Sequence, residues 1–227
     1  MTKGTKTQKG KKKILLAGFE PFDGERLNSS GQAVERFRGS VIADREVVSE
    51  ILPCAFGESL TELKRAIDRV KPELVLCIGQ AGGRSAIGLE RIAINLDDAR
   101  IPDNNDSQPI DEPVVKGGPA AYWSTLPIKA IVQALNEARI KAEVSNTAGT
   151  FVCNHVFYGL MRTLKRLNGI RGGFIHVPYL PQQAKVIRKK TPIPSMSLRQ
   201  ITNGIEIAAE TSLTVDEDLQ ISGGALH

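Results

Sequence analysis

The chain has 227 residues, of which 41% are hydrophobic and 24% are charged, and its formal net charge is +5. This length and composition predict one globular domain with a substantial core. No run approaches the roughly 18 apolar residues that cross a bilayer, so we expect no membrane partner.

The positive charge is concentrated at one end of the chain. Residues 1–13 contain six lysines and no acid, whereas the rest of the chain carries 24 basic and 25 acidic residues. We therefore expect a disordered, lysine-rich tail over 1–13 and a single folded domain over 14–227. Because the folded part has no visible basic stripe, we expect no nucleic-acid partner.

Cysteine usage indicates the compartment. The three cysteines, Cys54, Cys77 and Cys153, form neither a disulfide framework nor a CxxC pair. The N-terminus has no apolar segment behind its lysines, so it does not read as a secretory signal. These features predict a cytoplasmic protein. The cysteines and the three histidines are not clustered as metal ligands are, so we expect no metal.

Strand-like and helix-like segments alternate in the first half of the chain. Buried apolar runs predict strands over 13–19 and 46–52. Apolar residues then recur at helical spacing over 59–70, and a central strand follows over 73–79. The segment 85–96 is rich in β-branched residues and is expected to be extended.

The second half opens with a polar stretch, 97–119, that contains four prolines. A loop of this length in a compact domain is uncommon and is often functional. The pattern continues with alternating helices and strands: a helix over 128–138, a strand over 142–146, a helix over 153–167, a strand over 172–180 and a helix over about 198–213.

This alternation predicts a three-layer α/β/α sandwich with a mixed, largely parallel sheet in a single domain. Sites in such folds lie at the carboxyl ends of the strands. Four loops are therefore of interest: those after Ala17 and Ile78, the one before Cys153, and the one after His176.

Cys153 has two interpretations. Free cysteine is among the most buried residue types, and helical spacing places Cys153 with apolar neighbours, which favours a core role. Alternatively, Gly149 permits a tight turn into the helix, so that Cys153 lies in the first helical turn. Unpaired backbone N–H groups there favour an anion and are expected to lower the pKa of a thiol, as a nucleophile requires.

A nucleophilic cysteine needs a base. His155 lies two residues further along the helix and so points away from Cys153, and His227 ends the chain and is expected to be mobile. This leaves His176, late in a strand at the same edge of the sheet. The alternative is a hydrogen-bonded core histidine.

The third member of a triad is a carboxylate that orients the imidazole. Asp97, Asp98 and Asp103 are candidates, but Glu90 is the more specific one. If 85–96 is one strand, Glu90 shares an apolar face with Ile92 and Ile94, which is costly unless the acid is paired, for example with His176. The alternative is a structural ion pair with one of two arginines, Arg84 or Arg100.

Two phenylalanines follow the first strand in GFEPFDG, residues 18–24. Aromatic side chains near a strand's carboxyl end can line a ligand pocket, and Phe19 and Phe22 are the candidates here. The alternative is that both rings pack in the core beneath the loop.

Four blocks together carry a resemblance to a known family: GFEPFDGERLNSSG, GQAGGRSAIGLERIAINLDDARIPDN, SNTAGTFVCNHVFY and GGFIHVPYLP. In this order and spacing they resemble the pyroglutamyl-peptidase I family, also called pyrrolidone-carboxylate peptidases. The similarity runs from about residue 14 to the last helix. No departure occurs inside the blocks, whereas the lysine run is unlike the family.

The resemblance implies a cysteine peptidase that hydrolyses the N-terminal pyroglutamyl residue from peptides. It places the nucleophile on Cys153, the histidine on His176 and the third catalytic residue on Glu90. It also implies a homotetramer that works without a cofactor. The implied substrate-binding residues are Phe19 and Phe22, which would sandwich the lactam ring, and Gln80 and Arg100.

Two other functions are compatible with such a fold, because fold does not determine function. A nucleoside-phosphorylase-like transferase would depend on phosphate and would be indifferent to thiol alkylation. A catalytically dead lactam-binding module would bind without turnover. The presence of all three of Cys153, His176 and Glu90 favours the peptidase over the binding module.

Overall fold

A computed structural model describes residues 12–187 and 191–224. Nine strands are present in this part of the chain: β1 (Lys13–Phe19), β2 (Val41–Ile42), β3 (Arg45–Leu52), β4 (Leu74–Gln80), β5 (Ile87–Glu90), β6 (Ile92–Ile94), β7 (Ala121–Trp123), β8 (Ala142–Ser145) and β9 (Arg171–Val177). The helices are α1 (Ser29–Glu35), α2 (Glu58–Val70), α3 (Ile128–Glu137), α4 (Val152–Leu164), α5 (Pro181–Val186) and α6 (Leu198–Thr214).

Seven strands form one mixed sheet in the order β2-β3-β1-β4-β9-β5-β8. The pairs β1–β3, β1–β4, β4–β9 and β5–β8 are parallel, whereas β2–β3 and β5–β9 are antiparallel. The expected mixed, largely parallel sheet is therefore confirmed. The same order brings β4, β9 and β5 side by side, and these strands carry most of the candidate site.

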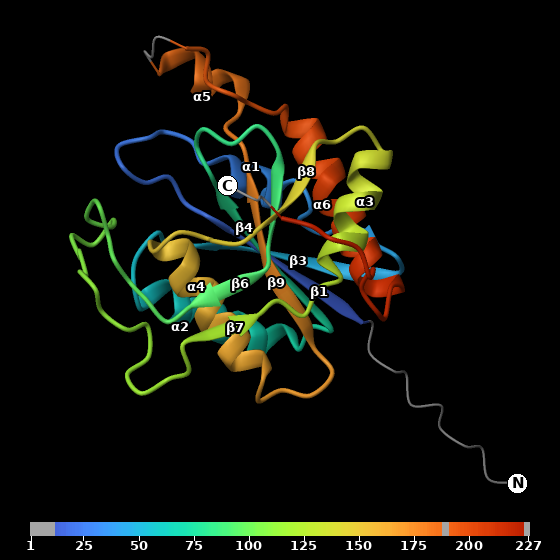
Figure 1. Ribbon diagram of the computed structural model, residues 1–227, viewed down its shortest axis with the longest axis horizontal. Helices are drawn as coiled ribbons and strands as arrows, with labels where there is room; N and C mark the ends of the chain where they lie inside the picture. The colour runs from blue at the N-terminus through green and yellow to red at the C-terminus, as the bar shows by residue number, and fades with distance from the viewer. Residues whose placement is uncertain (1–11, 188–190, 225–227) are drawn as a thin grey trace, which may run out of the picture.

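Helices cover both faces of the sheet, as the predicted three layers require (Figure 1). Alternate residues of β1 point to opposite faces: Ile14 and Leu16 pack with α1, α3 and α6, and Leu15 and Ala17 pack with α2 and α4. All four side chains are fully buried. The central strands are therefore packed between two apolar layers. The helix α4 lies with α2 on one face of the sheet, opposite the face that α1, α3 and α6 cover.

The segment 85–96 is not one strand, contrary to expectation. β5 lies in the main sheet, whereas β6 pairs with β7 in a separate two-stranded sheet. The chain turns away at Arg91, so Ile92 and Ile94 do not share a sheet with Glu90. Sequence periodicity could not reveal this break, because the partner strand β7 lies about 30 residues further along the chain.

The predicted tail lies mostly outside the described residues. Within the part that is described, Lys13 already begins β1, and Lys12 Nζ contacts Glu73 Oε2 at 2.8 Å. The folded domain therefore starts slightly earlier than the predicted boundary. His227 also lies outside the described residues. No helix within the described ranges is long and apolar enough to span a bilayer.

Candidate active site

Three neighbouring strands meet at the centre of the candidate site. Gly79 of β4 pairs with His176 of β9, and Gly88 of β5 pairs with His176 from the other side. His176 is thus flanked in the sheet by two glycines. Because paired residues point to the same face of a sheet, neither of these two strand partners places a side chain beside the imidazole.

Cys153 fills part of that space from above. The chain reaches α4 through Gly149, whose φ of 76° lies in the left-handed region that glycine tolerates. α4 starts at Val152, so Cys153 lies in its first turn, as predicted. A methyl group placed on Gly79 would lie 2.9 Å from the Cys153 sulfur. The thiol therefore sits directly over Gly79, next to the strand position of His176.

His176 and Glu90 are hydrogen-bonded. His176 Nδ1 lies 2.8 Å from Glu90 Oε1, and the carboxylate is completely buried. Burial alone would raise the pKa of Glu90. The hydrogen bond from His176, the positive charge that His176 can carry and the charge of Arg84 together outweigh burial and keep this pKa below its ordinary value. Glu90 is therefore ionised, and an ionised carboxylate only accepts hydrogen bonds. Nδ1 must carry the proton, which leaves Nε2 as the basic nitrogen.

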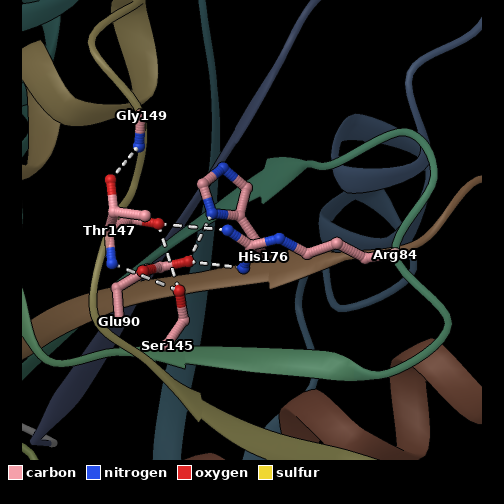
Figure 2. A network of polar contacts seen from close by, with 6 residues as sticks. All are labelled: Arg84, Glu90, Ser145, Thr147, Gly149 and His176. Carbon is pink, nitrogen blue, oxygen red and sulfur yellow. Dashed lines mark hydrogen bonds and ion pairs between the residues drawn. The ribbon is translucent and has the colours of Figure 1, made fainter. Parts of the chain in front are cut away.

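Arg84 also binds Glu90. The acid is therefore both the partner of His176 and a member of an ion pair with an arginine, which the sequence presented as alternatives. Arg84 Nη1 donates to Glu90 Oε1 at 2.7 Å, and Nη2 donates to the backbone oxygen of Thr147 at 3.0 Å (Figure 2). The glutamate is shared between a histidine and an arginine. Residue spacing offers Arg84 only as an alternative to His176, whereas in the structure it is a second partner of Glu90.

The thiol of Cys153 is less acidic than its place in the helix predicts. Burial raises its pKa to about 12, with the negative charge of Glu90 acting in the same direction and Arg84 opposing it. The expectation of a lowered pKa is therefore wrong, because desolvation outweighs the effect of the helix start. The resting site therefore holds a neutral thiol, and its proton must move during the reaction.

Alkylation rates test this protonation state. Only the thiolate reacts with iodoacetamide, so the rate at Cys153 should rise about tenfold per pH unit between pH 7 and 9, following the thiolate fraction below a raised pKa. Mass spectrometry of the Cys153 peptide measures this rate separately from Cys54 and Cys77. A rate that stays constant down to pH 6 would instead indicate a preformed thiolate–imidazolium pair.

His155 has a different role from His176. Its Nδ1 lies 2.7 Å from Asp97 Oδ2, and its Nε2 accepts the N–H of Gly57 at 3.0 Å. The ring also packs edge-on against Phe56. Both nitrogens are therefore engaged in contacts that join α4 to the start of α2 and to the 97–119 loop, so His155 stabilises the helix start that carries Cys153.

The two candidate pocket phenylalanines lie in different surroundings. Phe19 is only 2% exposed, ends β1 and packs against Phe174 at a ring distance of 6.2 Å. Phe22 is partly exposed and packs at 6.0 Å against Phe151, the residue that caps α4. Phe22 thus lies beside the helix start that carries Cys153. Phe19 lies in the apolar layer below.

The side chain of Gln80 points away from Cys153. Gln80 follows Gly79 in β4, so the two residues face opposite sides of the sheet. Its Oε1 accepts from Ser29 N and Gln183 Nε2, and its Nε2 donates to Glu25 Oε2, all within 2.9 Å. These bonds tie α1 and α5 to the end of β4. The geometry therefore gives the Gln80 side chain a structural role, which sequence spacing did not anticipate.

The 97–119 loop packs over this edge of the molecule. Arg100 is exposed on it, whereas Asp103 is buried and accepts the N–H of Phe56 at 2.7 Å. The next residue, Asn104, donates to Glu20 Oε1 at 2.8 Å and to Pro21 O at 2.9 Å. The loop is thus fastened to the segment that carries Phe22. The loop is visible in the sequence, but these anchors are not, since each joins residues far apart in the chain.

No group of three His, Cys, Asp or Glu side chains within 12–187 and 191–224 is arranged to hold a metal ion. The arrangement is instead that of a thiol, an imidazole and an ionised carboxylate in sequence. Such an arrangement can carry out nucleophilic acyl transfer, with the thiol as nucleophile and the oriented imidazole as base.

Comparisons with known proteins agree with this chemistry. The family model described as pyroglutamyl peptidase matches residues 12–215. A pyrrolidone-carboxylate peptidase of Erwinia tasmaniensis is 56% identical over 216 residues, covering 95% of this chain and 100% of the relative. A pyrrolidone-carboxylate peptidase of Yersinia pestis is 52% identical over 217 residues, with the same coverage.

Solved structures give the same result. The crystal structure of pyroglutamyl peptidase I from Bacillus amyloliquefaciens superposes with a TM-score of 0.89 at 49% identity, covering 93% of this chain and 100% of that one. The pyrrolidone carboxyl peptidase from Thermococcus litoralis superposes with a TM-score of 0.90 at 38% identity, covering 93% and 99%. By sequence and by fold, this chain belongs to the pyroglutamyl peptidase family of cysteine peptidases.

Proposed function

We propose that this protein hydrolyses the bond after an N-terminal pyroglutamyl residue of peptides, with Cys153 as nucleophile, His176 as base and Glu90 as the orienting acid. The observation that carries the assignment is the position of the Cys153 sulfur over Gly79, whose strand partner His176 is held by an ionised Glu90. Family membership favours this peptidase over the phosphorylase-like transferase.

Acylation of the enzyme transfers the thiol proton to the leaving amine, forms the S–C bond and breaks the C–N bond. His176 Nε2 accepts the thiol proton while Cys153 Sγ bonds to the pyroglutamyl carbonyl carbon. Protonated His176 then gives that proton to the leaving amine as the C–N bond breaks, which leaves a thioester. A water molecule, activated by the same nitrogen, hydrolyses the thioester and restores the thiol. Glu90 keeps the imidazole in the required tautomer and stabilises its protonated form.

The start of α4 supplies donors for the negative oxygen that forms during attack. The first helical hydrogen bond runs from His155 N to Phe151 O, so the N–H groups of Val152, Cys153 and Asn154 have no acceptor within the helix. Donors of this kind stabilise a developing oxyanion. Arg100, which the family resemblance places among the substrate-binding residues, is proposed as a further donor from the neighbouring loop.

The substrate suits an apolar pocket with few charges. Pyroglutamate is a flat, neutral lactam without a free α-amine, so its site needs apolar walls and a few hydrogen bonds. Phe22 is the better placed wall because it is partly exposed beside the capping residue of α4. We propose Phe19 as the floor, and Gln80 as a residue that supports the pocket through its backbone position.

The direct test compares two fluorogenic amides. The protein should release a fluorescent amine from the pyroglutamyl amide and leave the prolyl amide intact, because proline has a basic amine and lacks the lactam carbonyl. Prior treatment with iodoacetamide should abolish the release. Well-folded protein that cleaves neither amide would overturn the proposal.

Asn104 should influence substrate affinity through Phe22. Replacing Asn104 by alanine removes the bonds to Glu20 and Pro21 that fasten the Phe22 segment. We expect KM for the pyroglutamyl amide to rise about fivefold with little change in kcat, which corresponds to a loss of about 1 kcal/mol from the two hydrogen bonds together. Steady-state kinetics over a range of substrate concentrations separates the two constants.

Asn105 provides the matched control. It is the next residue on the same loop, but its side chain donates to Glu58 Oε2 on α2 at 2.8 Å and not to the Phe22 segment. Asn105→Ala should therefore leave KM unchanged. Equal effects of Asn104→Ala and Asn105→Ala would show that general loosening of the loop, and not the position of Phe22, governs affinity.

We further propose that the protein acts in the cytoplasm as a homotetramer. The three cysteines are all free, in keeping with a reducing compartment, and the tetramer is what the family resemblance implies. Light scattering on a size-exclusion column measures the number of subunits.

A further inference from the structure

Arg84 occupies a central position between the acid and the nucleophile. It lies in the loop between β4 and β5 and makes two contacts through different nitrogens. Nη1 donates to Glu90 Oε1, the same oxygen that His176 Nδ1 contacts, and Nη2 donates to the backbone oxygen of Thr147 (Figure 2). One guanidinium therefore connects the acid–base pair to the chain segment that precedes α4.

The fold makes room for this guanidinium at Gly88. A methyl group added to Gly88 would lie 2.5 Å from Arg84 Nη1 and 3.6 Å from Glu90 Oε1. Gly88 has no left-handed φ, so backbone strain does not require glycine here. Because Gly88 pairs with His176 across β5 and β9, the guanidinium lies over the strand position next to the imidazole. A side chain at position 88 would collide with the guanidinium, so the glycine there independently indicates that Arg84 occupies this position in the folded protein.

The Thr147 contact belongs to an ordered turn. Ser145 Oγ donates to the backbone oxygen of Thr147 at 3.1 Å, and Thr147 Oγ1 accepts the N–H of Gly149 at 3.0 Å. Gly149 begins the passage into α4, with Cys153 four residues later. Through Thr147, Arg84 thus helps to fix the path of the chain that delivers the nucleophile.

We propose that Arg84 is a positioning residue for the reaction, which fixes Glu90 and the Thr147 turn relative to each other and limits how strongly Glu90 favours protonated His176. This inference rests on the proposed function for its catalytic consequence. Besides Glu90 and Arg84, the titratable groups that act on one another at this site are the thiols of Cys153 on α4 and Cys77 on β4. Both are neutral near pH 7, because burial raises the pKa of each thiol. Arg84 is therefore the fixed cation that balances Glu90.

Removal of the cation should alter the pH profile in one direction. Without Arg84, the whole charge of Glu90 acts on the imidazole, so His176 is protonated more easily and less free base is present in mildly acidic solution. The lower limb of the profile of kcat/KM against pH should move to higher pH. Activity should fall about tenfold more at pH 6 than at pH 8, because fewer protons compete for the base at the higher pH.

Three variants and a control separate charge from geometry. Arg84→Met removes the charge and should move the lower limb. Arg84→Lys retains the charge but not the two-point contact, so it should lower kcat at every pH without moving the limb. Gly88→Ala places a methyl group against the flexible end of Arg84 and should move the limb as Arg84→Met does. Arg91→Met is the control, because Arg91 follows β5 but donates to Gly223 O, away from the site.

Two readouts decide the outcome. The pH profile uses the pyroglutamyl amide, and the ¹⁵N chemical shifts of the His176 imidazole follow the same titration without substrate. An Arg84→Met protein whose profile and imidazole titration match those of the wild type would overturn this inference. Wild-type protein without turnover would overturn the proposed function instead, and the imidazole titration of Arg84→Met would still test the effect of Arg84 on His176.

Discussion

Replacing Cys153 by alanine is expected to lower kcat/KM for a pyroglutamyl amide by about 10⁴-fold or more, because no other described thiol lies over Gly79 beside His176. Cys153→Ser should be almost as inactive, because an alcohol is a far weaker acid than a thiol and His176 would have to remove its proton. The measurement is amide turnover at a protein concentration high enough to detect such a loss.

Cys54→Ala is the matched control for this substitution. Cys54 is buried in the same apolar cluster, but it follows β3, which is separated in the sheet from the strand β9 of His176 by β1 and β4. Cys54→Ala should retain most of the activity and should remain sensitive to iodoacetamide. Full activity in Cys153→Ala, or loss of iodoacetamide sensitivity in Cys54→Ala, would place the nucleophile elsewhere.

Replacing Glu90 by glutamine should lower kcat by about 10³-fold with a smaller change in KM. The amide has nearly the same shape as the carboxylate but carries no charge, and its NH₂ group can donate to His176 Nδ1. Donation there would place the imidazole proton on Nε2, the nitrogen that must accept the thiol proton. The protonated imidazole would also lose its charged partner.

Glu90→Asp tests whether charge alone is sufficient. It retains the negative charge but shortens the side chain, so it should regain part of the activity only if the carboxylate still reaches His176. Thermal melting of both variants distinguishes loss of function from loss of folding. If folded Glu90→Gln has wild-type kcat, the carboxylate is a structural partner of Arg84 and not part of a triad.

Much of the fold was predictable because its elements carry strong local patterns. The periodicity of α2 and the apolar runs of β1 and β4 are confirmed to within a few residues, as is the start of α4 next to Cys153. Each of these elements has a nearly continuous buried side, and burial imposes the periodicity.

The elements that sequence analysis missed are short or depend on distant partners. α1 has only seven residues, SSGQAVE, and forms because Asn28 caps it and because Ala33 and Val34 pack against the sheet. β6 needs β7 as its partner, and neither has a periodic pattern of its own. Their existence follows from tertiary contacts, which a local pattern does not encode.

The candidate site divides in the same way. An acid on a buried strand must be paired, so the sequence indicated that Glu90 has a histidine or an arginine as its partner, although His176 lies 86 residues away. The shared role of Arg84 depends on the space above Gly88, and the engagement of Gln80 depends on Gln183, 103 residues further along. Neither has a signal in residue spacing, because each is a consequence of strand order.

The most direct test of the account uses a pyroglutamyl chloromethyl ketone, which must both occupy the lactam pocket and alkylate the nucleophile. Peptide mapping by mass spectrometry after limited exposure should find one label, on Cys153, and the corresponding prolyl ketone should label this residue far more slowly. A label on any other residue, or equal labelling by the two ketones, would contradict the proposal that Cys153 is the nucleophile of a lactam-specific site.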